Sequence, residues 1–161
     1  MTTPSLKQLV RNPDHFFAFG FGTGLSPWAP GTMGTLAAIP IYWLIQDVSW
    51  PIYLSWLLVT FILGVYWCGR SSRALGVHDH GGIVWDEFVG YWVTMFMAPK
   101  GWIWILLGFV LFRFFDIVKP WPIRWLDRRV KGGFGIMVDD LLAGILAGIS
   151  LQIIACLGLF A

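Results

Sequence analysis

Two pairs of carboxylates lie beside apolar segments of this chain, and their side chains could hold a divalent metal ion. Asp86 and Glu87 end the stretch GIVWDE, and Asp139 and Asp140 end the similar stretch GIMVDD. Each pair is predicted to begin an apolar helix, where neighbouring side chains point about 100° apart, so one member of each pair can face a shared ion. Oxygen ligands suit Mg²⁺ or Mn²⁺ and are poor for zinc or copper without His or Cys.

A purely structural interpretation of these acids is that they are helix N-terminal carboxylates favoured by the helix dipole, which is worth about 0.3–1 kcal/mol each. That role does not require pairs. An ionised side chain in a membrane helix costs about 2.5–3.5 kcal/mol at the bilayer centre and usually serves function. We therefore favour the functional interpretation.

A second group of charged residues lies between the last two apolar segments. Arg113, Asp116 and Lys119 are spaced at i, i+3 and i+6, which places them near one helical face. Arg113 and Lys119 are predicted to bind a phosphate monoester. Asp116 could be a further metal ligand or a general base, and Asp127 could orient a cation or a water.

The other cations of this segment, Arg128, Arg129 and Lys131, have a simpler interpretation as a polybasic loop on anionic lipid headgroups. A Gly-rich segment, GFGTGLSPWAPGTMGTL, precedes the first apolar helix and contains Gly31 and Thr32. Free N–H groups at the start of a helix bind phosphate. Clusters of glycine and proline are more often plain loops, however. The loop His78-Asp79-His80 could assist a metal, but a solvated loop is the simpler interpretation.

The sequence does not contain the residue patterns that other phosphatase mechanisms require. Cys68 is followed by Arg73 but has Trp67, not His, before it, and the chain has only three histidines and no D-x-D motif. Metal-assisted attack by water remains. The two cysteines provide no disulfide framework or CxxC metal motif.

The composition indicates that water is not the main solvent of the chain. Hydrophobic residues make up 57% and charged residues 12%, with a mean hydropathy of +0.70. A net charge of +2 gives no reason to expect a nucleic-acid partner. We predict an all-α, polytopic membrane bundle forming a single domain over 1–161, with 1–20 as an N-terminal interfacial segment. Its apolar helices are expected at about 35–45, 52–68, 83–98, 102–115 and 141–160.

Only the second and fifth of these segments approach the roughly 20 residues that span a bilayer; the others are short or partly spanning. If every segment crosses and the N-terminus is inside, Lys100 and Asp47 are the only charged residues outside. Ten of the eleven Lys and Arg residues are then inside, as the positive-inside rule favours: Lys7, Arg11, Arg70, Arg73, Arg113, Lys119, Arg124, Arg128, Arg129 and Lys131. The carboxylate pairs are also expected on this cytoplasmic side.

Four motifs in order, APGTMGTL, IVWDEFVGYW, RFFDIVKPWPI and GGFGIMVDDLLAG, resemble the phosphatidylglycerophosphatase A family of bacterial membrane phosphatases. The resemblance runs from about Phe19 to Ala147. It implies an enzyme that uses Mg²⁺ to remove the terminal phosphate of phosphatidylglycerophosphate in the bacterial inner membrane, releasing phosphatidylglycerol and inorganic phosphate.

Our mechanistic hypothesis places Mg²⁺ on Asp86, Glu87, Asp139 and Asp140, with water attacking the phosphate in line. The partner is then a phospholipid in the membrane, and no obligate protein partner is evident. The rival hypothesis is a small divalent-cation transporter or channel, because carboxylates in membrane helices also mark ion pathways. Such a pathway should carry acids at several depths, whereas these gather at one face.

Overall fold

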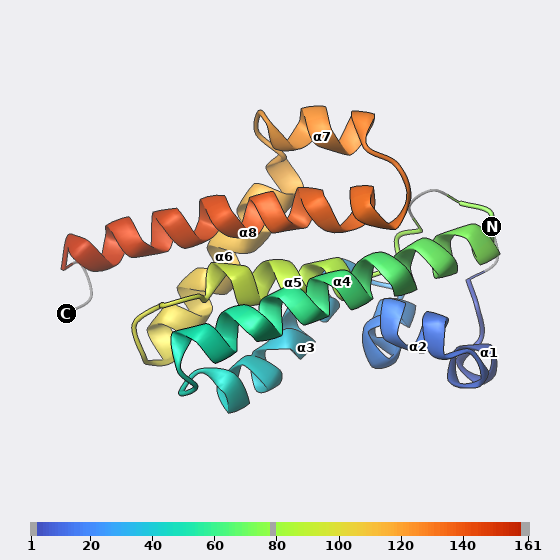
Figure 1. Cartoon of the computed structure of the whole chain (residues 1–161), viewed down its shortest axis with the longest axis horizontal. Helices are drawn as coiled ribbons and strands as arrows, with labels where there is room; N and C mark the ends of the chain where they lie inside the picture. Colours follow the sequence, from blue (N-terminus) through green and yellow to red (C-terminus); the bar gives the residue numbers. More distant parts are fainter. Residues whose placement is uncertain (1–2, 78–79, 159–161) are drawn as a thin grey trace.

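The computed structural model describes residues 3–77 and 80–158, and the regular structure in these ranges is entirely helical (Figure 1). The predicted all-α class is confirmed. His78 and Asp79 lie outside the described residues. In chain order the elements are α1 (Leu6–Arg11), α2 (Pro13–Ala18), the 3-10 helix η1 (Gly20–Leu25), α3 (Pro30–Ile45), α4 (Trp50–Leu75), α5 (Trp85–Thr94), α6 (Trp102–Val118), α7 (Ile123–Arg129) and α8 (Gly132–Cys156).

Proline and glycine set several helix ends. Pro30 and Pro51 stand in the first turns of α3 and α4, where a missing N–H costs nothing. Gly76 ends α4 in the left-handed conformation, with φ of 67°, and its N–H caps the last carbonyls. Lys119 ends α6 in the same conformation, with φ of 44°, so its side chain leaves the line of the helix.

The predicted start of the last helix at 141 was wrong. α8 begins at Gly132, so Asp139 and Asp140 lie two turns inside it rather than at its N-terminus. Hydropathy alone placed the boundary at the acids, but their side chains point into the bundle and do not interrupt the helix. The third helix is shorter than predicted, because α5 covers only Trp85–Thr94, and Asp86 and Glu87 do occupy its first turn.

The short helix α5 lies at the centre of the bundle, packed by α3, α4, α6 and α8. Trp92 is fully buried there and donates its indole N–H to the carbonyl of Ala38, 3.0 Å away. Glycines allow α8 to approach its neighbours closely. A Cβ at Gly133 would lie 2.0 Å from the carbonyl oxygen of Val65 on α4, and one at Gly144 would lie 2.4 Å from that of Gly90 on α5. Further contacts along these helices show their directions: Gly133 lies against Gly69 and Met137 against Gly64, so α8 is antiparallel to α4, while Gly144 lies against Gly90 and Gly148 against Thr94, so α8 is parallel to α5.

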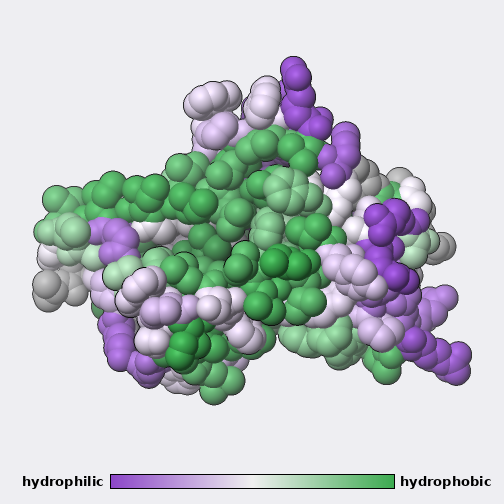
Figure 2. Space-filling view, in the orientation of Figure 1, coloured by the Kyte–Doolittle hydropathy of each residue, from purple (hydrophilic) through white to green (hydrophobic). Residues whose placement is uncertain are grey.

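The face of the bundle in Figure 2 is largely apolar in its middle, and hydrophilic residues gather mainly on the side of the view that carries α1, α2 and α7, with a smaller group at the opposite end. At the opposite end Asp47 and Lys100 form an exposed ion pair. Among the described helices, α4 and α8 have the length and hydropathy to cross a membrane, fewer than the five apolar helices expected. Exposed large apolar side chains on α4, α6 and α8 fit association with a membrane.

The N-terminal segment packs on the bundle. α2 lies against α4, where the Nδ1 atom of His15 is 2.7 Å from the hydroxyl of Ser71. Leu9 of α1 is fully buried. This segment thus anchors the beginning of the chain to the polar end of α4.

Candidate active site

Three carboxylates from two helices meet inside the bundle. Asp86 and Glu87 come from the first turn of α5 and Asp140 from α8, and one oxygen of each lies within 4.8 Å of the others. Because α5 and α8 are parallel and in close contact, the two acidic pairs reach the same depth, as their sequence similarity predicts. We call Asp86, Glu87 and Asp140 the carboxylate triad.

The triad has the chemistry of a site for a hard divalent cation. Asp86 and Asp140 are buried, at 8% and 3% exposure. Each member has a buried oxygen without a hydrogen-bond partner among the described residues: Asp86 Oδ1, Glu87 Oε2 and Asp140 Oδ2. Buried polar atoms are nearly always paired, and several carboxylates in one place repel each other unless a cation or protons intervene. The donor set therefore fits Mg²⁺.

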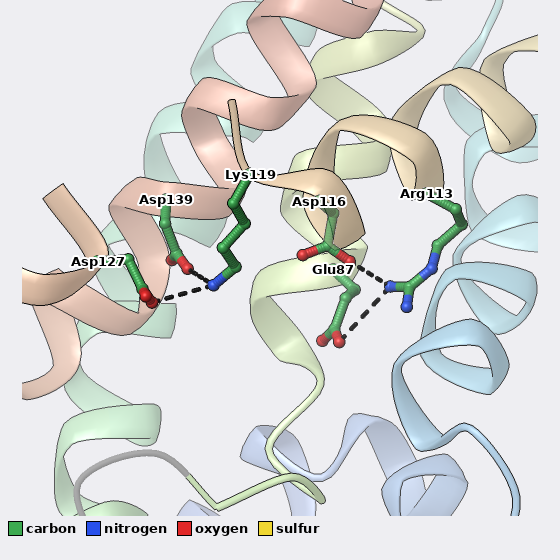
Figure 3. Close-up of polar contacts among 6 residues, drawn as sticks. All are labelled: Glu87, Arg113, Asp116, Lys119, Asp127 and Asp139. Atoms are coloured by element: carbon green, nitrogen blue, oxygen red, sulfur yellow. Dashed lines mark hydrogen bonds and ion pairs between the residues drawn. The ribbon is translucent and has the colours of Figure 1, made fainter. Parts of the chain in front are cut away.

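Asp139 points away from the triad into a second cluster. Its Oδ2 accepts a hydrogen bond from Lys119 Nζ at 2.5 Å, and the same ammonium contacts Asp127 Oδ1 at 3.0 Å (Figure 3). Neighbouring residues of a helix diverge by about 100°, so Asp139 and Asp140 meet different partners. The structure thus brings three of the four predicted metal ligands together, and the ligand role of Asp139 stays a prediction.

The charge state of Lys119 follows from these contacts. Burial alone would lower the pKa of its ammonium, but the carboxylates of Asp139 and Asp127 raise that pKa above its usual value. Lys119 is therefore a fixed cation that balances two acids at the edge of the site.

Arg113 and Asp116 lie on one face of α6, as their spacing predicts, and their side chains meet. Arg113 Nη1 is 2.6 Å from Asp116 Oδ2 and 3.7 Å from Glu87 Oε1. Both side chains are mostly buried, at 15% and 12% exposure. Asp116 is also close enough to Asp140 to interact with it electrostatically. A guanidinium thus stands beside the carboxylate triad, whereas Lys119, beyond the end of α6, joins the other cluster.

The start of α3 lies directly against this guanidinium. A Cβ at Gly31 would be 2.2 Å from Glu87 Oε1 and 3.1 Å from Arg113 Nη1, so only glycine fits without displacing both side chains. Thr32 follows and is half-buried. The first N–H groups of a helix have no partner within it, and no described side chain caps α3. Gly31 therefore brings the start of α3, with its free backbone donors, to the site.

Cys68 is a further neighbour of the site, and the sequence offered no reason to expect it there. It is fully buried on α4, interacts with the carboxyl of Asp86 and lies 4.0 Å from the sulfur of Met137. Its apolar sequence context gives no signal of this position, because only the packing of α4 on α5 and α8 creates it.

The comparisons with known proteins agree with the geometry. The profile of the family described as Phosphatidylglycerophosphatase A matches residues 16–155. A Phosphatidylglycerophosphatase A of Escherichia coli is 53% identical over 86% of this chain and 81% of its own length, and one of Haemophilus influenzae is 48% identical over 89% and 90%. A Bacteroides thetaiotaomicron protein with a provisional phosphatidylinositol-3-phosphatase name is 38% identical over 78% and 83%. No solved structure matches the chain significantly.

Proposed function

Since this chain belongs to the phosphatidylglycerophosphatase A family, we propose that it hydrolyses the terminal phosphate monoester of phosphatidylglycerophosphate with the help of Mg²⁺, leaving phosphatidylglycerol and inorganic phosphate. The observation that carries this proposal is the buried carboxylate triad beside Arg113 and the start of α3. In this proposal a metal site and anion-binding groups would lie next to each other there, as metal-assisted phosphate chemistry requires.

Asp86, Glu87 and Asp140 would hold the ion in this proposal. When bound, Mg²⁺ neutralises phosphate oxygens and lowers the pKa of a water for attack. Asp139, the fourth predicted ligand, forms an ion pair with Lys119. The carboxylate triad is therefore the smallest set of ligands in this proposal.

Arg113 and the first turn of α3 would bind the terminal phosphate. The ion pair with Asp116 holds the guanidinium in place and leaves other N–H donors for phosphate oxygens. The N–H groups of Gly31 and Thr32 add donors at the positive end of the helix dipole. The absence of a side chain at Gly31 lets the phosphate approach both groups at once.

Asp116 and Lys119 would complete the chemistry at the two edges of the site. Asp116 lies between Arg113 and Asp140 and could accept a proton from the attacking water. Lys119, held by Asp127 and Asp139, keeps one ammonium hydrogen for the substrate. Asp127 then orients this cation.

We place the protein as a multi-pass protein of the bacterial inner membrane with its site facing the cytoplasm. The support is the gathering of hydrophilic residues toward the end with α1, α2 and α7, near the site. The acids of the described part are distributed in the same way, since only Asp47 lies at the far end, exposed and paired with Lys100. An ion pathway would need acids between these ends, so this asymmetry favours an enzyme over a transporter.

The test is phosphate release by the purified protein in neutral detergent. We expect release from phosphatidylglycerophosphate with Mg²⁺, none in excess chelator, and recovery when Mg²⁺ is restored. Phosphatidylinositol 3-phosphate is the comparison substrate. Full activity in chelator would overturn the metal assignment, and preferred hydrolysis of the inositol lipid would overturn the substrate assignment.

A further inference from the structure

A separate pocket lies where α6 turns into α7, on the polar side of the bundle. Its volume is about 570 Å³, and it is lined by Val118, Lys119, Pro120, Trp121, Arg124, Trp125, Arg128 and Arg129. No carboxylate of a described residue lines it. Lys119 is shared between this pocket and the second cluster, because its ammonium contacts Asp139 beside the carboxylate triad. We call this cavity the α7 pocket.

The α7 pocket carries positive charge that the described protein does not neutralise. Lys119 is balanced by Asp127 and Asp139. Arg124, Arg128 and Arg129, in contrast, form no ion pair with any described residue. Three guanidiniums around one cavity are a strong binding site for an oxygen anion such as a phosphate.

Two of these arginines are held in position by neighbours that leave their charge available. Arg124 Nη2 donates to the carbonyl of Val118 at 3.2 Å, which ties α7 to the end of α6. The guanidinium of Arg129 lies over the ring of Trp125, 5.6 Å from its centroid. An arginine that is already held in place loses less conformational entropy when it binds an anion.

The walls of the α7 pocket suit a ligand that has an apolar part. Trp121 and Trp125 are 83% and 51% exposed, and Val118 is 43% exposed. Exposed tryptophans beside cations are typical of the membrane–water interface, where the ring lies at headgroup level. A ligand of the α7 pocket would therefore have its anion among the arginines and its apolar chains in the adjoining lipid.

We propose that the α7 pocket binds the phosphodiester of an anionic phospholipid, and specifically the inner phosphate of the substrate while its terminal phosphate is at Arg113. This assignment rests on the proposed function. The substrate has two phosphates joined by one glycerol. Lys119 lines the α7 pocket, and its ammonium contacts Asp139, the residue next to Asp140 of the carboxylate triad. A lipid with a phosphomonoester alone would leave the α7 arginines unpaired, so the pocket would favour a substrate with both groups.

The first experiment measures lipid binding without turnover. Native mass spectrometry of the full-length protein in neutral detergent gives the Kd for phosphatidylglycerol, which has the diester but no monoester. We expect Arg124→Gln with Arg128→Gln to weaken this Kd at least tenfold, about 1.4 kcal/mol. The matched control, Arg73→Gln with Lys131→Gln, removes the same charge from exposed positions outside the pocket and should change the Kd less than threefold. If both variants weakened phosphatidylglycerol binding equally, the lipid would bind through general surface charge, and the proposed binding role of the α7 pocket would be wrong.

The second experiment distinguishes the substrate's own diester from that of a separate lipid. Phosphatidylglycerol should inhibit phosphate release competitively, and the Arg124→Gln, Arg128→Gln variant should raise its inhibition constant and the KM by similar factors. Non-competitive inhibition, or activation, would show a separate lipid in the pocket and overturn the substrate assignment. If the wild-type protein released no phosphate, the proposed function would fail, while the binding ratio would still decide whether the pocket holds a phosphodiester.

Discussion

Asp140→Asn should abolish activity and yet stabilise the metal-free protein. The substitution keeps the size of the side chain and removes one charge from the carboxylate triad, whose oxygens lie within 4.8 Å of each other. At an effective dielectric constant of about 20, two unit charges at that separation repel by about 3.5 kcal/mol. Asp140 faces two such neighbours, Asp86 and Glu87, so the metal-free triad can be ionised only at a cost of several kcal/mol.

Protonation relieves part of that repulsion in the wild-type protein. We therefore expect the substitution to raise the unfolding free energy of the metal-free protein by about 1 kcal/mol, which corresponds to about 2–4 °C in Tm for a protein of this size. In Mg²⁺ the order reverses, because the wild-type protein gains stability from the ion and the variant gains little. Phosphate release should fall at least about 100-fold, the upper end of the range for disturbing a metal's outer shell.

The assay is thermal unfolding of the purified protein in chelator and in Mg²⁺, beside phosphate release. Asp47→Asn is the matched control, since its exposed ion pair with Lys100 is worth about 0–1 kcal/mol and lies far from the site. Near-normal turnover of Asp140→Asn at limiting Mg²⁺, with the same Mg²⁺-dependent rise in Tm as the wild type, would refute the metal assignment.

Three further results follow from the same geometry. Gly31→Ala places a Cβ 2.2 Å from Glu87 Oε1 and should lower activity at least tenfold. Gly81→Ala, whose Cβ would have no described atom within 4 Å, should leave activity unchanged; equal activities of the two variants would remove α3 from the site. Lys119→Gln removes the Lys119 cation from Asp139 and should lower the unfolding free energy by about 1–3 kcal/mol. Adding Asp139→Asn should restore most of that loss, and additive losses in the double variant would contradict the pairing. In a Cys156→Ser background, cysteines at Arg73 and Lys131 should be labelled from the cytoplasm and those at Asp47 and Lys100 from outside; labelling of Arg73 and Lys131 from opposite sides would refute the topology.

The sequence was sufficient to predict a carboxylate cluster that includes all three members of the carboxylate triad, together with Asp139. The two similar stretches place acids at matching positions of two helices, and the parallel packing of α5 on α8 brings those positions to one depth. The position of Arg113 and Asp116 on one face of α6 also followed from their i, i+3 spacing, because residues three apart share a helical face; their ion pair was not predicted.

Other features required the packed structure. Which of Asp139 and Asp140 faces α5 depends on the rotation of α8, and hydropathy also misplaced the start of that helix. The position of Gly31 against Glu87 depends on how α3 crosses α5. Lys119 departs from the face of Arg113 because the backbone turns left-handed at that residue, which periodicity within a helix cannot indicate.

The position of Asp140 on the last helix has a consequence for biosynthesis. α5 leaves the ribosome before α8, so Asp86 and Glu87 are made before the residue that completes the carboxylate triad. A nascent or truncated chain that ends before Gly132 contains Arg113, Gly31 and only two members of the triad. Under the proposed metal assignment, such a chain would not hydrolyse lipid phosphates, and activity would begin only after α8 has been made and has packed against α5.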